Sequence, residues 1–156
     1  MEFKTDIFSQ YDKKWGLLTA GSKDKFNMMT ISWGGMGTLW SKPVVTAYVR
    51  TSRYTHEFMD DNEYFTVSFF PEEYKKILGI LGSKSGRDMD KINGSGLTAK
   101  EIGKSVTFEE AEVTLLCRKL FVQRLDPANI INDDDKAFYA NDSEHDMYIG
   151  EVVEIC

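Results

Sequence analysis

The pattern of apolar and polar residues along the chain predicts more strands than helices. Apolar runs of strand length, or alternation with a period of two, occur in six segments: Trp15–Ala20, Phe26–Trp33, Val44–Val49, Glu63–Phe70, Glu112–Arg124 and Met147–Ile155. The first two flank a turn-like GSKDK stretch and therefore predict a hairpin. The glycine-rich run Gly34–Gly37 is expected to break the strand pattern, and Pro43 to open the next strand.

Helical signals are fewer and shorter. A helix is expected to start at a cap provided by Ser52 or Thr55 and to run to about Asp61. The other two predicted helices cover Glu72–Leu81 and Asn132–Ala140. Strands do not alternate regularly with long helices, which excludes a doubly wound parallel sheet. The sequence therefore predicts a mainly β fold with short helices, an antiparallel barrel with helical excursions, in one domain over residues 1–156.

Charge and cysteine content narrow the function classes. The 156 residues carry a net charge of −6, which argues against a nucleic-acid binder and against polybasic association with a membrane. No apolar run reaches the roughly 20 residues that span a bilayer, and the N-terminus lacks the apolar core of a signal peptide. Cys117 and Cys156 form neither a disulfide framework nor a metal-ligand pattern, so no metal is expected and a cytoplasmic location is predicted.

Positive charge gathers in Arg50–Thr55 (RTSRYT), between a predicted strand and a predicted helix. Two guanidinium groups, hydroxyl side chains and free amides at a helix N-terminus suit a phosphate. The alternative is an ordinary capped helix with surface arginines. A second segment, Gly82–Lys91 (GSKSGRDMDK), is dense in Gly, Ser and cations and resembles an anion-binding nest, although a solvated loop has the same composition.

The strand Asn27–Trp33 offers a surface for a flat ring. One of its faces carries Met28, Thr30 and Ser32, which are small or adaptable, and the alternative is a barrel strand with one wet side. The two histidines, His56 and His145, are interpreted as surface groups until context argues otherwise. Because the chain lacks the GxGxxG, GxSxG, HExxH and paired CxxC motifs, any redox chemistry must come from a bound cofactor.

Taken in order, these motifs resemble the flavin reductase-like family of FMN-binding split barrels, including its flavoredoxin-like members. The matching segments are spread over nearly the whole chain: Asn27–Gly34, Lys42–Thr55, Asn62–Phe70, Gly82–Ile92, Phe108–Arg118 and Glu144–Val152. The resemblance implies an antiparallel split β-barrel of Greek-key type that forms a homodimer and binds FMN in a groove near the dimer interface.

The resemblance also assigns roles to individual residues. The isoalloxazine ring is expected to lie along the first strand segment, at Asn27, Met28, Met29, Thr30, Ser32 and Trp33. The phosphate and ribityl groups are expected at the two cationic segments, held by Arg50, Ser52, Arg53, Tyr54, Thr55, Ser83, Ser85, Gly86, Arg87, Asp88 and Lys91. His145 matches a histidine before the last strand that approaches the nicotinamide or the flavin, and it is the candidate catalytic residue.

Two functions fit this resemblance. The first is an NAD(P)H-dependent flavin reductase, in which the dihydronicotinamide stacks on the flavin and passes hydride to N5. The second is a flavoredoxin-like electron carrier that keeps FMN bound and exchanges electrons with a redox partner protein. A split barrel that has lost its cofactor is a third alternative, which the cationic segments disfavour.

Overall fold

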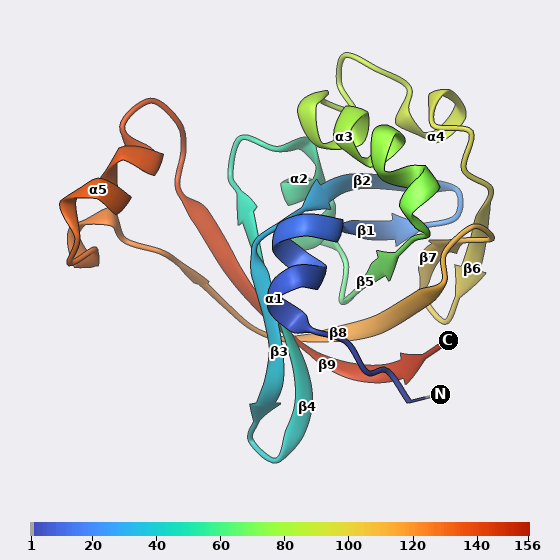
Figure 1. Cartoon of the computed structure of the whole chain (residues 1–156), viewed down its shortest axis with the longest axis horizontal. Helices are drawn as coiled ribbons and strands as arrows, with labels where there is room; N and C mark the ends of the chain where they lie inside the picture. Colours follow the sequence, from blue (N-terminus) through green and yellow to red (C-terminus); the bar gives the residue numbers. More distant parts are fainter. Residues whose placement is uncertain (1) are drawn as a thin grey trace.

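The computed structural model describes residues 2–156, and their main feature is an antiparallel sheet of seven strands (Figure 1). A separate hairpin contributes two further strands. The strands are β1 (Gly16–Ser22), β2 (Lys25–Ile31), β3 (Gly34–Leu39), β4 (Lys42–Arg50), β5 (Tyr64–Phe69), β6 (Ala99–Ile102), β7 (Ser105–Phe108), β8 (Val113–Arg124) and β9 (His145–Ile155). The predicted mainly β, antiparallel fold is confirmed, including the β1–β2 hairpin.

The order of strands in the large sheet explains where the barrel is split. Neighbouring strands are hydrogen-bonded in the order β2-β1-β5-β8-β9-β4-β3, and the described residues form no ladder between the end strands β2 and β3. These two strands are nevertheless consecutive in the chain, because β2 ends at Ile31 and β3 begins at Gly34. The backbone therefore crosses the split at Ser32 and Trp33, which places these two residues at the opening of the sheet.

The glycine run Gly34–Gly37 was wrongly predicted to interrupt the strands, since it lies in β3. This strand pairs only with β4 and forms an edge of the sheet, where missing side chains cost little packing. At Gly34 the small residue is required, because a Cβ there would lie 2.8 Å from Tyr11 Cε1 and from the Thr46 carbonyl oxygen. The short hairpin β6–β7, which packs on β1 and β5, was not predicted.

The helices are short and lie outside the sheet. They are α1 (Ile7–Ser9), a π-helical turn (Gln10–Lys14), α2 (Tyr54–Asp61), α3 (Lys75–Ser83), α4 (Lys91–Gly94), α5 (Asp133–Lys136) and 3-10 turns at Glu72–Tyr74, Pro127–Asn129 and Ala137–Tyr139. The expected caps at Ser52 and Thr55 are wrong. Arg53 occupies the N-cap position of α2 without a capping side chain, because the Ser52 hydroxyl donates to Asp142 and the Thr55 hydroxyl accepts from Asn27. None of the described helices is long and apolar enough to cross a membrane.

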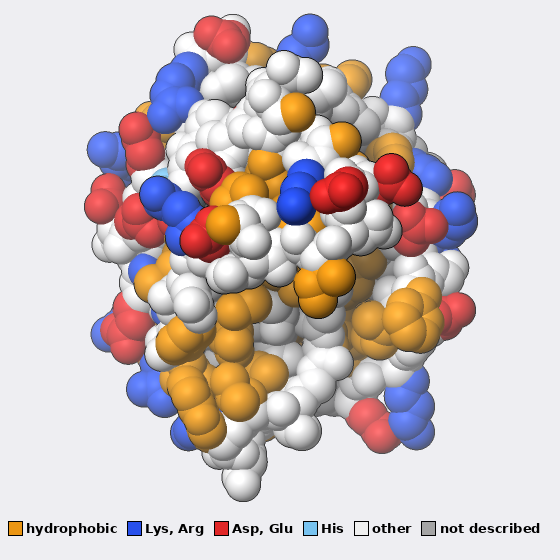
Figure 2. Space-filling view, turned by 90° about the vertical axis from the view of Figure 1, so that its left-hand side faces the viewer, with side chains coloured by type: hydrophobic (Ala, Val, Ile, Leu, Met, Phe, Trp, Pro, Cys, Tyr) orange, Lys and Arg blue, Asp and Glu red, His pale blue; other side chains and the backbone are white. Residues whose placement is uncertain are grey.

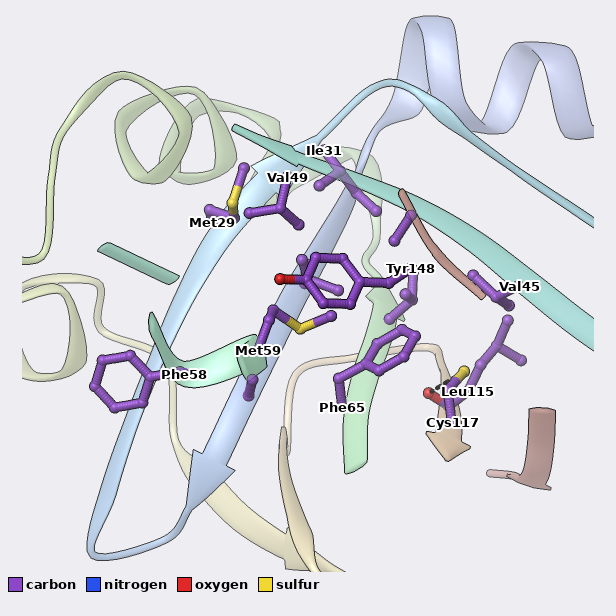
Figure 3. Close-up of a cluster of buried hydrophobic side chains, with 14 of the residues drawn as sticks. Met29, Ile31, Val45, Val49, Phe58, Met59, Phe65, Leu115, Cys117 and Tyr148 are labelled. Atoms are coloured by element: carbon purple, nitrogen blue, oxygen red, sulfur yellow. Dashed lines mark hydrogen bonds between the residues drawn. The ribbon is translucent and has the colours of Figure 1, made fainter. Parts of the chain in front are cut away.

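Two cores hold the elements together. The larger one fills the inside of the curved sheet, where the fully buried ring of Tyr148 lies among Phe65, Met59 and the aliphatic side chains of β2 and β4 (Figure 3). The smaller one lies under α3, where Met28 and Leu78 pack with residues of β7. Successive residues of β2 point into different cores, because Met29 belongs to the larger one and Met28 to the smaller one.

The connection from β8 to β9 leaves the body of the molecule. The pair Arg124–Asp146 ends the ladder between these strands. Residues 125–144 form an excursion that carries α5 and projects away from the sheet (Figure 1). Its two ends are tied by the Leu125 amide, which donates to the carbonyl of His145 at 3.0 Å. The predicted helix Asn132–Ala140 is present here as α5 followed by a 3-10 turn.

Candidate functional site

The two cationic segments of the sequence meet in space. Arg87, from the loop after α3, donates to the carbonyl of Ser52 at 3.2 Å and to Glu57 at 3.1 Å. Its guanidinium also lies 4.8 Å from the centre of the Tyr54 ring. The Arg50–Thr55 turn and the Gly82–Lys91 loop are thus in contact, and we refer to them as the two walls of the candidate site.

Two cations line the inside of this site, Arg53 and Lys91. Arg53 donates through Nη1 to the carbonyl of Gly82 at 2.8 Å. Lys91 donates through Nζ to the carbonyls of Leu81, at 2.8 Å, and Met28, at 2.9 Å. Both cations therefore satisfy carbonyls at the C-terminal end of α3, where the helix dipole favours positive charge.

Lys91 is buried and Arg53 is half-buried, and both lack an anionic partner among the described residues. Lys91 is only 2% exposed, and neither side chain forms an ion pair with any residue that the structure describes. The Arg53 Nη2 atom is buried and has no hydrogen-bond partner. Burial lowers the pKa of Arg53, and burial together with the charge of Arg53 lowers the pKa of Lys91 to about 8. A buried lysine beside a half-buried arginine that repels it and has an unused donor is a favourable site for an anion.

A network of small contacts fixes the distance between the two walls. The Asn27 side-chain amide donates to the buried Thr55 hydroxyl at 2.8 Å. Gly86 packs directly on Asn27 and on Tyr54, because a Cβ at Gly86 would lie 2.3 Å from Asn27 Oδ1 and 2.9 Å from the Tyr54 ring. The loop can approach β2 and α2 this closely only with glycine at position 86.

Arg50 points away from Arg53 and toward the excursion. Its two terminal nitrogens donate to the carbonyls of Ser143, at 2.6 Å, and Phe138, at 3.0 Å, and its Nε lies 3.5 Å from a carboxylate oxygen of Asp142. Ser52 also faces this segment, since its amide donates to the Ser143 hydroxyl at 3.1 Å. In this structure Arg50 and Ser52 hold the excursion, although the sequence grouped them with the phosphate-binding residues.

Aromatic side chains meet where the chain crosses the split. The Trp33 ring is 44% exposed and lies 5.3 Å from the imidazole of His145 and 5.2 Å from the Phe138 ring. A cavity of about 150 Å³ adjoins them and is lined by residues of β2, of the β2–β3 connection, of β4 and of β9: Met29, Thr30, Ile31, Ser32, Trp33, Tyr48 and His145. It contains four of the six residues that the sequence assigned to the flavin ring.

His145 is not the surface group that the residue pattern alone suggested. Its side chain is buried, and its Nδ1 shares a 2.8 Å hydrogen bond with the Tyr139 hydroxyl. Burial and then the positive charge of Arg50 lower the pKa of His145 to about 4. The imidazole is therefore neutral at physiological pH, when one of its nitrogens is a donor and the other an acceptor.

The remaining predicted residues differ in how they reach the site. The Met28 side chain lies in the core under α3, and only its carbonyl contributes, as the acceptor for Lys91. Thr30 donates its hydroxyl to the carbonyl of Leu78. Ser83 and Asp88 are exposed on the loop, and the Ser85 hydroxyl accepts a hydrogen bond from the amide of Arg87 at 3.1 Å. These contacts shape the loop, and the Ser85 O–H remains without an acceptor among the described residues.

One further cluster of ionisable groups lies beside β9. His56, which was wrongly interpreted as a surface group, bonds Asp146 at 2.6 Å and lies near Asp60, and these three could in principle hold a metal. However, Arg124 donates to both oxygens of Asp146, and the Tyr148 hydroxyl donates to Asp60 at 2.6 Å. The carboxylates are already bound, so the cluster acts as a structural network that joins α2 to β8 and β9.

Comparison with known protein families identifies the fold and its class of ligand. The model of the flavin reductase-like domain matches residues 8–156. The chain belongs to this family. Its site therefore belongs to a flavin-related protein.

Several solved structures of the family are similar to this chain, and no curated protein sequence matches it. The FMN-binding protein of Thermus thermophilus, solved with bound 1-cyclohex-2-enone, is 19% identical with a TM-score of 0.72 over 100% of this chain and 78% of its own. Flavoredoxin of Methanosarcina acetivorans is 23% identical with a TM-score of 0.71 over 100% and 74%. The NADH:FAD oxidoreductase of Streptomyces globisporus, in complex with NAD and FAD fragments, is 16% identical with a TM-score of 0.68 over 92% and 73%.

Three residues near the aromatic cavity were not predicted from the sequence: Tyr48, Phe138 and Tyr139. Tyr48 lies in a β4 segment that reads as an ordinary apolar strand. Phe138 and Tyr139 reach the site because the excursion is held beside the end of β4 by Arg50 and beside His145 by the Tyr139 hydroxyl. No local motif predicts the contact between the excursion and the sheet. Two aromatic residues in an otherwise polar stretch do, however, indicate burial or binding.

Proposed function

We propose that this protein binds FMN and acts as an NAD(P)H-dependent flavin reductase. The observation that carries the proposal is the pair of cations Arg53, half-buried, and Lys91, buried, which have no anionic partner among the described residues and leave one buried guanidinium nitrogen unused. A flavin phosphate carries roughly two negative charges at neutral pH and supplies the missing partner. Membership of the flavin reductase-like family supports the choice of FMN over another phosphate.

The residues divide into two groups around the proposed cofactor. Arg53, Lys91 and the uncapped N-terminus of α2 would hold the phosphate, with hydroxyl groups from the two cationic segments beside them. Gly86 lets the loop approach Asn27 and Tyr54, beside which the ribityl chain would lie, and the ring would lie along the end of β2 near Ser32 and Trp33. Arg50 and Arg87 position these walls through their hydrogen bonds to backbone carbonyls.

His145 would orient the reacting rings without acting as a charged group. When bound, FMN supplies the capacity to accept a hydride at N5 from the dihydronicotinamide. The chain contributes a neutral imidazole, held by Tyr139, and an aromatic wall formed by Trp33. These groups would align the planar rings and exclude water. Hydride transfer between the rings requires no side-chain nucleophile.

The proposal is tested by reconstitution followed by anaerobic stopped-flow reduction. The purified protein should take up close to one FMN per chain, and the flavin absorbance should then bleach rapidly with NADH or NADPH. A protein that cannot be reconstituted with FMN would rule out this function. The competing hypothesis, a flavoredoxin-like electron carrier, predicts tight FMN binding with negligible reduction by either nicotinamide, so the same measurement separates the two.

The proposal extends to the setting of the protein. We propose a homodimer and a redox partner protein on the basis of the family resemblance, and a cytoplasmic location, with which the free thiols of Cys117 and Cys156 are compatible. Sedimentation of the FMN-loaded protein measures the predicted dimer directly. The preferred nicotinamide is measured by comparing the two reduction rates.

A further inference from the structure

A second, larger cavity lies under the excursion. It has a volume of about 600 Å³, which is in the range of small-molecule pockets. Its apolar wall consists of five residues: Trp33, Leu125, Ile130, Phe138 and Tyr139. The face that carries the excursion shows hydrophobic side chains gathered in its middle and lower parts, with charged side chains around them (Figure 2). We call this cavity the excursion pocket.

The charges at the excursion pocket argue against a nucleotide. Its lining contains one cation, Arg124, and this side chain already donates to both oxygens of Asp146. Two carboxylates, Asp126 and Asp135, also line the pocket. Phosphate groups would thus meet net negative charge and no free guanidinium pair, in contrast to the site around Arg53 and Lys91.

The excursion pocket is joined to the cavity beside β2 by shared side chains. Trp33 lines both cavities, and Tyr139 of the excursion pocket is hydrogen-bonded to His145 of the smaller cavity. When the neutral imidazole carries its proton on Nδ1, that nitrogen donates to the Tyr139 oxygen. The phenolic O–H is then free to donate to a carbonyl in the pocket.

We propose that the excursion pocket binds an uncharged quinone of one or two fused rings. The aromatic walls suit a flat ring, the lining excludes anions, and Tyr139 offers a donor to a quinone oxygen. The position next to the cavity beside β2 fits a quinone as an electron acceptor. That acceptor role rests on the proposed function, whereas the binding of the quinone does not.

Equilibrium dialysis of the full-length protein against 1,4-naphthoquinone tests the binding. We expect about one equivalent per chain and a saturable quench of Trp33 fluorescence, because a bound quinone would contact the indole. The quench should disappear in Trp33→Phe and remain in Trp40→Phe, since Trp40 lies at the β3–β4 turn outside the pocket. No binding, or a quench that survives the loss of Trp33, overturns the assignment.

Neighbouring isoleucines provide a matched pair of variants. Ile130 lines the pocket, whereas Ile131 is 98% exposed and lies outside its lining. Ile130→Asp should raise the dissociation constant for the quinone at least about tenfold, and Ile131→Asp should leave it unchanged. If Ile130→Asp does not fold, Phe138→Asp tests the same wall, because the Phe138 side chain is already half exposed. Equal binding by the lining variants and Ile131→Asp contradicts the proposal.

The same samples keep this inference separate from the proposed function. FMN uptake is measured on each variant by absorbance. Quinone binding without FMN uptake would support the excursion pocket as a quinone site and refute the proposed FMN-binding function. FMN uptake without quinone binding would support the FMN-binding function and refute the quinone site. Tyr139→Phe should weaken naphthoquinone binding several-fold while leaving the binding of naphthalene, which has no carbonyl, unchanged.

Discussion

The cationic end and the aromatic end of the site are built in different ways. At the cationic end, Asn27 of β2, Arg53 at the N-cap of α2 and Lys91 at the start of α4 are held by hydrogen bonds to Thr55 and to backbone carbonyls. At the aromatic end, Trp33 and Phe138 are about half exposed, and the pocket depends on an excursion held to the sheet mainly by Arg50. One end is part of the folded core, and the other is an attachment to it.

This difference assigns a double role to the cations. Arg53 and Lys91 satisfy the last carbonyls of α3 as well as offering positive charge to a ligand, so changes there affect both stability and affinity. Changes at the aromatic end should affect stability less, because no residue of the excursion belongs to either core. We therefore expect ligand anchoring to depend on the cationic end, and substrate choice to depend on the aromatic end.

The largest expected effect comes from removing the charge at the cationic end. Arg53→Ala should weaken FMN binding by about 10- to 100-fold, which corresponds to about 1.5–3 kcal/mol for a charged hydrogen bond. Riboflavin lacks the phosphate, so its affinity should change far less. The measurement is a fluorescence titration of both ligands with the wild type and the variant.

Arg50→Ala is the matched control for this prediction. Its guanidinium donates to carbonyls of the excursion, so its loss should disturb the excursion pocket more than the phosphate. Equal losses for FMN and riboflavin in Arg53→Ala would show that Arg53 acts only by holding the loop. A larger FMN loss in Arg50→Ala than in Arg53→Ala would reverse the assignment of the two arginines.

A methyl group at the tight contact between the two walls should have the next largest effect. In Gly86→Ala the added Cβ would overlap Asn27 Oδ1, and Asn27 is held in place by Thr55, so the loop must move. We expect a loss of about 1–3 kcal/mol in the free energy of unfolding, together with weaker FMN binding. Gly35→Ala is the control, because a Cβ at Gly35 in the edge strand β3 meets nothing within 4 Å. Denaturant unfolding of both variants measures whether the added methyl group costs more stability at Gly86 than at Gly35.

The same division explains what the sequence could reveal about the fold. Strands with alternating or continuous apolar residues were predictable, because burial on one or both faces leaves a period in the sequence. The edge strand β3 was not, since it pairs on one side only and carries glycines that no local rule assigns to a strand. The short strands β6 and β7 were missed because four residues are too few to show alternation.

The site shows a similar limit. The two cationic segments carry local signals, clusters of Gly, Ser and cations, and the structure brings them together through Arg87. No local pattern predicts which partner each arginine binds. Arg50 and Arg53 are three positions apart, yet Arg50 binds the excursion and Arg53 binds the end of α3. Burial of His145 depends on the Tyr139 hydroxyl and on the packing of Trp33, which only the folded chain brings together.

The pH dependence of FMN binding provides a finer test of the cationic end. Burial and the charge of Arg53 lower the pKa of Lys91 to about 8, so the free protein loses this positive charge above that pH. The bound phosphate favours the charged form, and FMN affinity should fall as the pH rises through 8, approaching about tenfold per pH unit. Riboflavin affinity should stay flat over the same range, and Lys91→Met should remove the slope for FMN.

The same lowered pKa makes a prediction about the free protein. The unfolded chain, in which Lys91 has its ordinary pKa of 10.5, binds more protons than the folded chain between pH 8 and 10.5. The contribution of Lys91 to the free energy of unfolding should therefore rise with pH across this window and be absent in Lys91→Met. Denaturant midpoints at a series of pH values measure it, and a falling contribution would mean that Lys91 is stabilised as a cation without a ligand.

The smallest expected effect lies at the aromatic end. His145→Ala should slow flavin reduction by NAD(P)H by less than about tenfold and change FMN affinity even less, since a neutral imidazole that only positions rings contributes less than a general acid. Because burial and Arg50 lower its pKa to about 4, its contribution should not vary between pH 5 and 8. His56→Gln is the control, as His56 belongs to the network around Asp146 and not to either cavity. A rate loss in His145→Ala that appears only below pH 7 would mean that this histidine is charged in the working protein, and the aromatic end would then be electrostatic in character like the cationic one.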